Sequence, residues 1–74
     1  MAPLKPLPFR EVQRKLEVAG FAQVGQKGSH VKFAKMTSEG RRTAIVPHFR
    51  EVSVGTLRSI LRQAGLEPDI FEAL

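Results

Sequence analysis

Two stretches of apolar residues at helical spacing flank a central segment that follows a different pattern. The first stripe runs from Phe9 to Ala19 and the second from Val54 to Ala64, with apolar residues every three or four positions. Helices of this length are not stable alone in water, so each stripe must pack on a partner layer. The central segment has to supply that layer, which restricts the chain to a few two-layer folds.

The central segment predicts three antiparallel strands. Residues 21–26 and 41–46 are candidate strands, and between them His30 and Lys32 alternate with the apolar Val31 and Phe33, as in a half-buried strand. Turn residues separate the strands at 27–29 and 37–40. We therefore predict an α+β fold: a two-layer αβββα arrangement in which a three-stranded antiparallel sheet carries both helices on one face.

Proline, glycine and serine mark the ends of the helices. Pro8 suits the first helical turn, where its missing N–H is not needed. Gly20 and Gly65 follow the two stripes and can end each helix in a left-handed conformation. Ser53 precedes the second stripe and is a favourable N-cap.

The flanking segments complete a single domain over residues 1–74. Residues 1–7 are rich in proline and are predicted to form an extended lead-in, whereas residues 67–74 are predicted to form a short helical tail. Three apolar residues of the tail are expected to dock on the core: Ile70, Phe71 and Leu74. Three basic residues of the first helix lie off its stripe and are expected to face solvent: Arg10, Arg14 and Lys15.

The charge of the chain favours a polyanionic partner. It carries 12 Lys and Arg against 7 Asp and Glu, a net charge of +5, and three of the acids lie in the last eight residues. A compact basic body attracts nucleic acid, an acidic protein or a membrane surface. The chain has 0 Cys, which excludes disulfides, thiolate metal sites and cysteine nucleophiles. With no apolar run long enough to span a bilayer and no signal-peptide core, we expect a cytoplasmic protein.

The segment from Gln26 to His30 is the richest in reactive groups. Backbone N–H groups of a Gly28-Ser29 turn can bind a phosphate oxygen, and Lys27 adds positive charge. His30 follows at the strand entrance, and an imidazole transfers protons near neutral pH. Because RNA carries its own nucleophile, the 2′-OH, one imidazole beside it could cleave RNA without a metal or cofactor. The alternative is a surface histidine in a turn with no special role.

Other basic residues have weaker assignments. Lys32, Arg41 and Arg42 are candidate phosphate contacts, or else solvated strand charges. His48 lies outside any metal-ligand spacing with His30, so no metal site is predicted. Phe49 fits no apolar stripe and is expected to be exposed, for a base or for a protein partner.

Three blocks of the sequence resemble the HicA-type (YcfA-like) toxins of toxin–antitoxin pairs. They are Gly20-Phe21 leading to Gln26-Lys27-Gly28-Ser29-His30, then Val46-Pro47-His48 with Arg50-Glu51-Val52, then residues 55–66, GTLRSILRQAGL. The resemblance implies a fold similar to a double-stranded-RNA-binding domain and a ribonuclease that cleaves mRNA and blocks translation. It also implies a HicB-type antitoxin as partner, and it places the family's catalytic histidine on His30.

Two further functions remain open at this point. A non-catalytic RNA-binding module of the same topology would grip duplex phosphates with a lysine cluster at the start of its last helix. Here the segment from Ser53 to Arg58 contains one Arg and no Lys, which argues against duplex binding. A protein-interaction domain with an acidic partner would carry the same charge, so charge alone does not separate it from the toxin.

Overall fold

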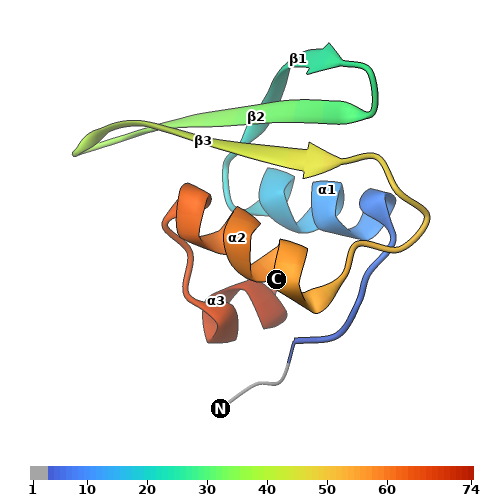
Figure 1. The fold of residues 1–74 in the computed structure, drawn as a ribbon. Helices are drawn as coiled ribbons and strands as arrows, with labels where there is room; N and C mark the ends of the chain where they lie inside the picture. Colours follow the sequence, from blue (N-terminus) through green and yellow to red (C-terminus); the bar gives the residue numbers. More distant parts are fainter. Residues whose placement is uncertain (1–3) are drawn as a thin grey trace.

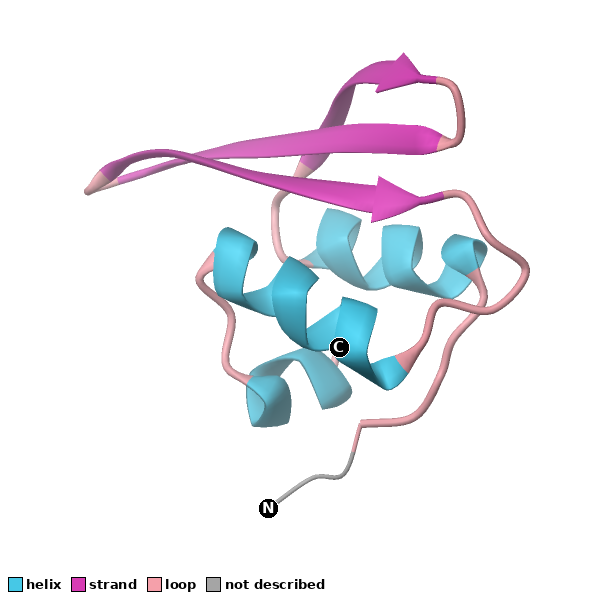
Figure 2. Ribbon diagram, in the orientation of Figure 1, coloured by secondary structure: helices cyan, strands magenta, loops and turns pink. Residues whose placement is uncertain are grey.

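A computed structural model of the chain describes residues 4–74 (Figures 1 and 2). The elements follow the order α1 (Phe9–Val18), β1 (Ala22–Lys27), β2 (His30–Thr37), β3 (Gly40–Pro47), α2 (Val54–Ala64) and α3 (Pro68–Glu72). The predicted α+β fold is confirmed, and the order is compatible with the topology of double-stranded-RNA-binding domains.

The strands form one antiparallel sheet in the order β1-β2-β3. Two tight hairpins set the register, with Lys27 opposite His30 in the first and Thr37 opposite Gly40 in the second. A bulge interrupts the pairing of β1 between Gln23 and Gly25. β2 runs to Thr37, beyond the alternating segment that predicted it, because the second hairpin pairs along its whole length with β3.

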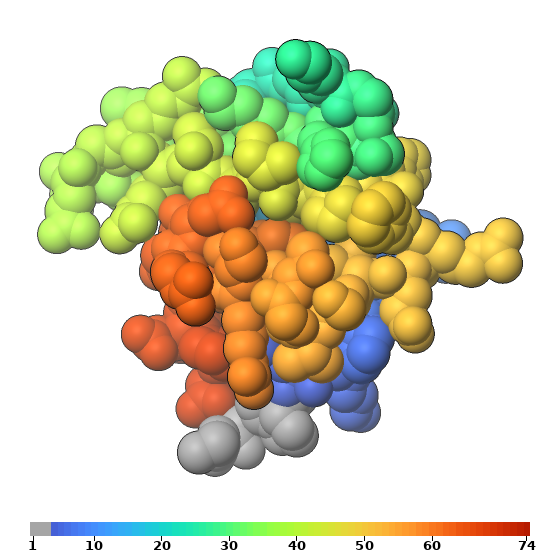
Figure 3. Space-filling view, viewed as in Figure 1, coloured from blue at the N-terminus to red at the C-terminus, as the bar shows by residue number. Residues whose placement is uncertain are grey.

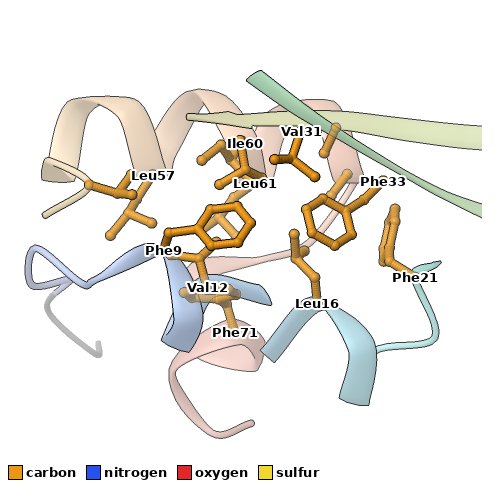
Figure 4. Close-up of a cluster of buried hydrophobic side chains, with 14 residues drawn as sticks. Phe9, Val12, Leu16, Phe21, Val31, Phe33, Leu57, Ile60, Leu61 and Phe71 are labelled. Atoms are coloured by element: carbon orange, nitrogen blue, oxygen red, sulfur yellow. The ribbon is translucent and has the colours of Figure 1, made fainter. Parts of the chain in front are cut away.

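The three helices lie on one side of the sheet and leave the other side open (Figure 1). α1 and α2 pack against the sheet, and α3 lies beneath them on the side remote from the strands. Between the layers is a core of buried side chains from every element except β1 (Figure 4): Phe9, Val12, Leu16, Phe21, Val31, Phe33, Ala44, Val46, Val52, Leu57, Ile60, Leu61, Ala64 and Phe71. The side of the sheet away from this core is therefore the one available to a ligand.

The predicted helix ends at Gly20, Ser53 and Gly65 are confirmed, whereas Pro8 lies in extended conformation at the N-cap rather than in the first helical turn. α1 starts directly after Pro8, and Gly20 and Gly65 have positive φ angles of 99° and 72°. The Ser53 hydroxyl accepts a hydrogen bond from the Thr56 backbone N–H at 3.3 Å. These helix ends could be predicted from the sequence because each depends on residues that are close to it in the chain.

Two expectations about side-chain exposure are wrong. Lys15 is only 7% exposed, because its ammonium donates hydrogen bonds to the carbonyls of Phe71, Glu72 and Leu74 at 3.0–3.2 Å. Ile70 is 55% exposed rather than docked, because α3 turns Phe71 into the core instead. The other two basic residues of the first helix, Arg10 and Arg14, are exposed as predicted.

The lead-in is pinned to the β3–α2 loop. Leu7 and Val52 exchange both backbone hydrogen bonds, at 3.1 and 2.6 Å, which forms an isolated antiparallel bridge. Residues 1–3 of the predicted lead-in lie outside the described residues. Within residues 4–74, no helix is long and apolar enough to cross a membrane.

Candidate active site

The first hairpin positions the candidate catalytic segment at one end of the sheet. Gly28 has a φ of 58°, whereas the φ of Ser29 is not positive. A positive φ at only the first of the two turn residues is the pattern of a type II′ turn. The Gln26 side-chain amide donates to the Gly28 carbonyl at 3.0 Å and holds the turn from one side. From the other side, the His48 backbone N–H donates to the Ser29 carbonyl at 2.6 Å. The turn is therefore fixed to both its own strand and the end of β3.

The amide groups of this turn are free to bind a ligand. Among the described residues, no group accepts a hydrogen bond from the backbone N–H of Gly28 or of Ser29. Two adjacent unpaired amides at an exposed turn form a favourable site for an anionic oxygen. The predicted phosphate-binding role of the turn is compatible with this geometry.

His30 lies on the open side of the sheet. It alternates with Val31 and Phe33, which are buried beneath the sheet, so its ring points away from the core. The ring is exposed, and no hydrogen bond or ion pair to it is found among residues 4–74. A substrate can therefore reach the imidazole, which a buried ring would have prevented.

A hollow of about 510 Å³ lies beside His30, and we call it the sheet hollow. It is lined by Gly25, Gln26, Lys27, His30, Lys32 and Ile45. No atom lies within 4 Å of the position that a Cβ of Gly25 would take, so the missing side chain leaves this space open. The lining carries two lysines and no acid, and its size is that of a small-ligand site.

The structure separates the other predicted phosphate contacts from this hollow. Arg41 pairs with Met36, which lies about 20 Å along β2 from His30 at the usual rise per residue. Arg42 points to the helix side of the sheet, where its Cζ lies 2.9 Å from the position that a Cβ of Gly65 would take. Of the predicted site residues, only Lys27, Gly28, Ser29 and Lys32 therefore lie together with His30.

Two lining residues were missed from the sequence. Gly25 and Ile45 come from different strands and both lie opposite Lys32 in the sheet. Counting outward from the second predicted turn places Ile45 opposite Lys32, but the first predicted turn at 27–29 would have placed Val24 there, because the actual turn is the two-residue Gly28-Ser29. The signal was therefore present for Ile45 in the position of the second turn, although neither residue type suggested a site.

His48 and Phe49 lie on the loop after β3. The His48 ring packs on Phe9 with 4.2 Å between ring centroids, and Phe49 is 51% exposed, as predicted. No group of three or more His, Asp or Glu side chains that could hold a metal ion occurs among the described residues.

Comparison of the sequence with known proteins identifies a family for the chain. None of the curated proteins matches the chain. The family model described as the HicA toxin of bacterial toxin–antitoxin systems matches residues 9–66, from the first residue of α1 to just beyond the Gly65 cap of α2. The match spans both hairpins and far more than half of the chain, so the protein belongs to the HicA family of toxins of bacterial toxin–antitoxin systems.

Proposed function

We propose that this toxin is an endoribonuclease that cleaves mRNA, with His30 as its catalytic residue and without a metal ion. The observation that carries the proposal is the exposed imidazole that lies between a hollow lined by two lysines and the adjoining turn, whose two backbone amides are unpaired among the described residues. Family membership supports a toxin, and this site supplies groups suited to phosphodiester cleavage in RNA.

The proposed reaction uses the 2′-OH of the substrate as nucleophile. His30 takes the 2′-OH proton while the 2′-oxygen attacks the adjacent phosphorus, and the bond from phosphorus to the 5′-oxygen breaks. The 5′-oxygen leaves as a hydroxyl with a proton from the imidazolium or from water. The products are a 2′,3′-cyclic phosphate and a 5′-hydroxyl end.

The surrounding groups would orient and stabilise the phosphate. The amides of Gly28 and Ser29 would bind a non-bridging oxygen as negative charge builds on it, and hydrogen-bond donors fixed in advance act strongly on such charge. Lys27 and Lys32 would add attraction for the RNA backbone. Arg41 and Arg42 are too distant or on the wrong side to join this step.

The test is cleavage of a single-stranded RNA by purified wild-type and His30→Ala proteins in the presence of EDTA. A positioned proton-transfer group contributes about 10²–10⁴-fold in rate, so the variant should lose at least about 10²-fold. A substrate with 2′-O-methyl groups should resist the wild-type protein, because its nucleophile is blocked. Arg62→Gln, on the exposed surface of α2, is a control with an equal or larger change of charge.

Several outcomes would contradict the proposal. Cleavage by His30→Ala at the wild-type rate would remove the assigned catalytic residue. Loss of activity in EDTA would indicate a metal-dependent reaction. Tight binding of duplex RNA with no cleavage of any RNA would instead favour a non-catalytic RNA-binding module.

A toxin of this class has an antitoxin partner, and we propose that it is of the HicB type. The open side of the sheet offers such a partner exposed apolar side chains: Ile45 lines the sheet hollow, and Val24 and Met36 line a separate hollow farther along the sheet. The protein encoded by the neighbouring gene, mixed with the toxin at equal concentration, should abolish cleavage and form a stable complex. Undiminished cleavage in that mixture would exclude the neighbour as the antitoxin.

A further inference from the structure

A second hollow lies where the β3–α2 loop meets the start of α1. It has a volume of about 330 Å³ and is lined by Pro8, Phe9, Arg10, His48, Phe49 and Arg50. The Phe9 backbone N–H donates to the Phe49 carbonyl at 3.1 Å, which holds the loop against the helix. Figures 1 and 3 show this loop projecting from the side of the molecule beside the N-terminal end of α1. We call this site the loop hollow.

Three aromatic residues line the loop hollow: Phe9, His48 and Phe49. Phe9 is buried and the His48 ring packs on it at 4.2 Å, with 36° between the ring planes. Phe49 is 51% exposed and, within residues 4–74, has no aromatic partner of its own. An exposed phenyl ring on a polar loop is available to stack on a flat ligand, and nucleobases stack on such rings regardless of their identity.

Unpaired cations border the same hollow. Arg10 and Arg50 are exposed, and no ion pair or side-chain hydrogen bond to either is found among the described residues. The acid next to Arg10 is engaged elsewhere, because Glu11 binds the Arg14 guanidinium at 2.6 Å. That hydrogen bond also lowers the pKa of Glu11. The lining itself contains no acid, so the hollow favours an anionic ligand.

The loop hollow adjoins the turn that carries His30. The His48 backbone N–H is bonded to the Ser29 carbonyl at 2.6 Å, and Pro47 lies opposite His30 in the sheet. A strand that passes the sheet hollow and continues around this end of the sheet would therefore reach the loop hollow next. The chemistry of the two sites is complementary, with phosphate donors at the turn and a stacking surface at the loop.

We propose that the loop hollow binds a second nucleotide of the same single-stranded RNA, with its base stacked on Phe49 and its phosphate held by Arg10 and Arg50. The inference rests on the proposed function for the identity of the ligand, but not for the chemistry of cleavage. It predicts that the protein holds RNA on both sides of the turn rather than at His30 alone.

The test measures equilibrium binding of a fluorescent single-stranded RNA of about ten nucleotides at low salt, in a His30→Ala background so that the RNA stays intact. Phe49→Ala should weaken binding about tenfold, the scale of one lost stacked base. Phe49→Tyr keeps a flat ring and should bind within about twofold of the parent. Ile70→Ala removes another exposed large apolar side chain, 55% exposed on α3, and should leave binding unchanged.

The cationic half of the site needs a matched pair of charge variants. Arg10→Gln with Arg50→Gln should weaken binding and reduce its dependence on salt. Arg58→Gln with Arg62→Gln removes the same charge from the exposed surface of α2 and should have the smaller effect. Thermal unfolding of every variant confirms that the fold is kept.

The outcomes separate this inference from the catalytic proposal. Equal binding by the Phe49→Ala and Ile70→Ala proteins would overturn the loop hollow, even if His30 proves catalytic. Rescue by Phe49→Tyr supports stacking, and its failure would contradict it. If His30→Ala cleaves RNA as fast as wild type while Phe49→Ala still weakens binding of an RNA protected by 2′-O-methyl groups, the catalytic assignment fails and the loop hollow stands. Loss of antitoxin binding by Phe49→Ala, with RNA binding intact, would assign the hollow to the protein partner instead.

Discussion

At the scale of single residues, Lys15 shows why exposure cannot always be predicted from a helical stripe. Its position off the apolar stripe of α1 predicted a solvated side chain. Its partners are three carbonyls of a tail more than fifty residues away, and its ammonium also lies 5.3 Å from the centroid of the Phe71 ring. No local pattern in the sequence reports such a contact, because only the tertiary fold brings the carbonyls to it.

Replacing this ammonium should destabilise the protein. Lys15→Met keeps most of the apolar stem and leaves the carbonyls of the tail without their donor. Hydrogen bonds to a charged group contribute roughly 1.5–3 kcal/mol, so we expect a loss of about 1–3 kcal/mol in the free energy of unfolding. Urea denaturation checks this, with the exposed Arg10→Met on the same helix as control. Equal stability of the two variants would show that the bonds from the Lys15 ammonium to the tail do not stabilise the fold.

Gly25 is the residue whose missing side chain matters most for the sheet hollow. Its φ is not in the left-handed region and no atom lies near a Cβ position, so Gly25→Leu should fold without strain and fill the hollow. We expect RNA cleavage to fall at least about tenfold, which corresponds to about 1.4 kcal/mol, with an unchanged melting temperature. Gly55→Leu, also in open space but on α2, is the matched control. Full activity of the Gly25→Leu protein would show that the hollow does not receive the substrate.

At the scale of elements, α3 is stabilised by the core although it lies beyond the residues matched by the family. The match ends at residue 66, whereas α3 spans Pro68–Glu72 and places Phe71 fully inside the core. The hydrophobic pattern correctly predicted a helical tail. It did not predict which apolar residue faces inward, because a helix of five residues has too few positions to define a stripe.

Adjacent residues of α3 should therefore respond very differently to truncation. Phe71→Ala removes a buried ring and should cost about 3–5 kcal/mol, a large share of the stability of a domain this small. Ile70→Ala changes an exposed side chain and should stay within about 0.5 kcal/mol of wild type. Thermal unfolding followed by circular dichroism distinguishes them. Similar melting temperatures for both would mean that α3 is not part of the cooperative core.

The two hairpins show which parts of the candidate site can be predicted from the sequence. The glycine turns at 28 and 40 were readable, and they determine which residues of neighbouring strands face each other. They therefore also determine that Lys32 meets Ile45. The bulge before Gly25 could not be predicted from the sequence, because it depends on how the edge strand β1 adapts to the twist of the sheet.

At the scale of the whole molecule, the positive charge is divided between separate surfaces. Composition predicted a polyanion partner but could not place each charge. The fold separates Lys27 and Lys32 at the sheet hollow from Arg41 near the end of the second hairpin and from Arg42 beside Gly65. Adjacent residues of a strand point to opposite sides, so the Arg41-Arg42 pair could not act as one patch.

The salt dependence of RNA binding measures how many of these charges contact phosphates. Each phosphate contact on single-stranded nucleic acid contributes about −0.7 to the slope of log K against log salt. Four contacts, two at each hollow, predict a slope of about −3. The Arg10→Gln, Arg50→Gln protein should show a slope less steep by about 1.4. An unchanged slope in this protein would place the phosphate contacts elsewhere.

The open side of the sheet carries both the imidazole and the exposed Val24, Met36 and Ile45 side chains. A partner that covers Ile45 would also cover the sheet hollow that Ile45 lines, so it would block the proposed RNA site without any rearrangement of the toxin. Control of the toxin then reduces to competition for one surface. The lifetime of the inhibited complex, rather than any internal switch, would determine how soon the toxin is released to act.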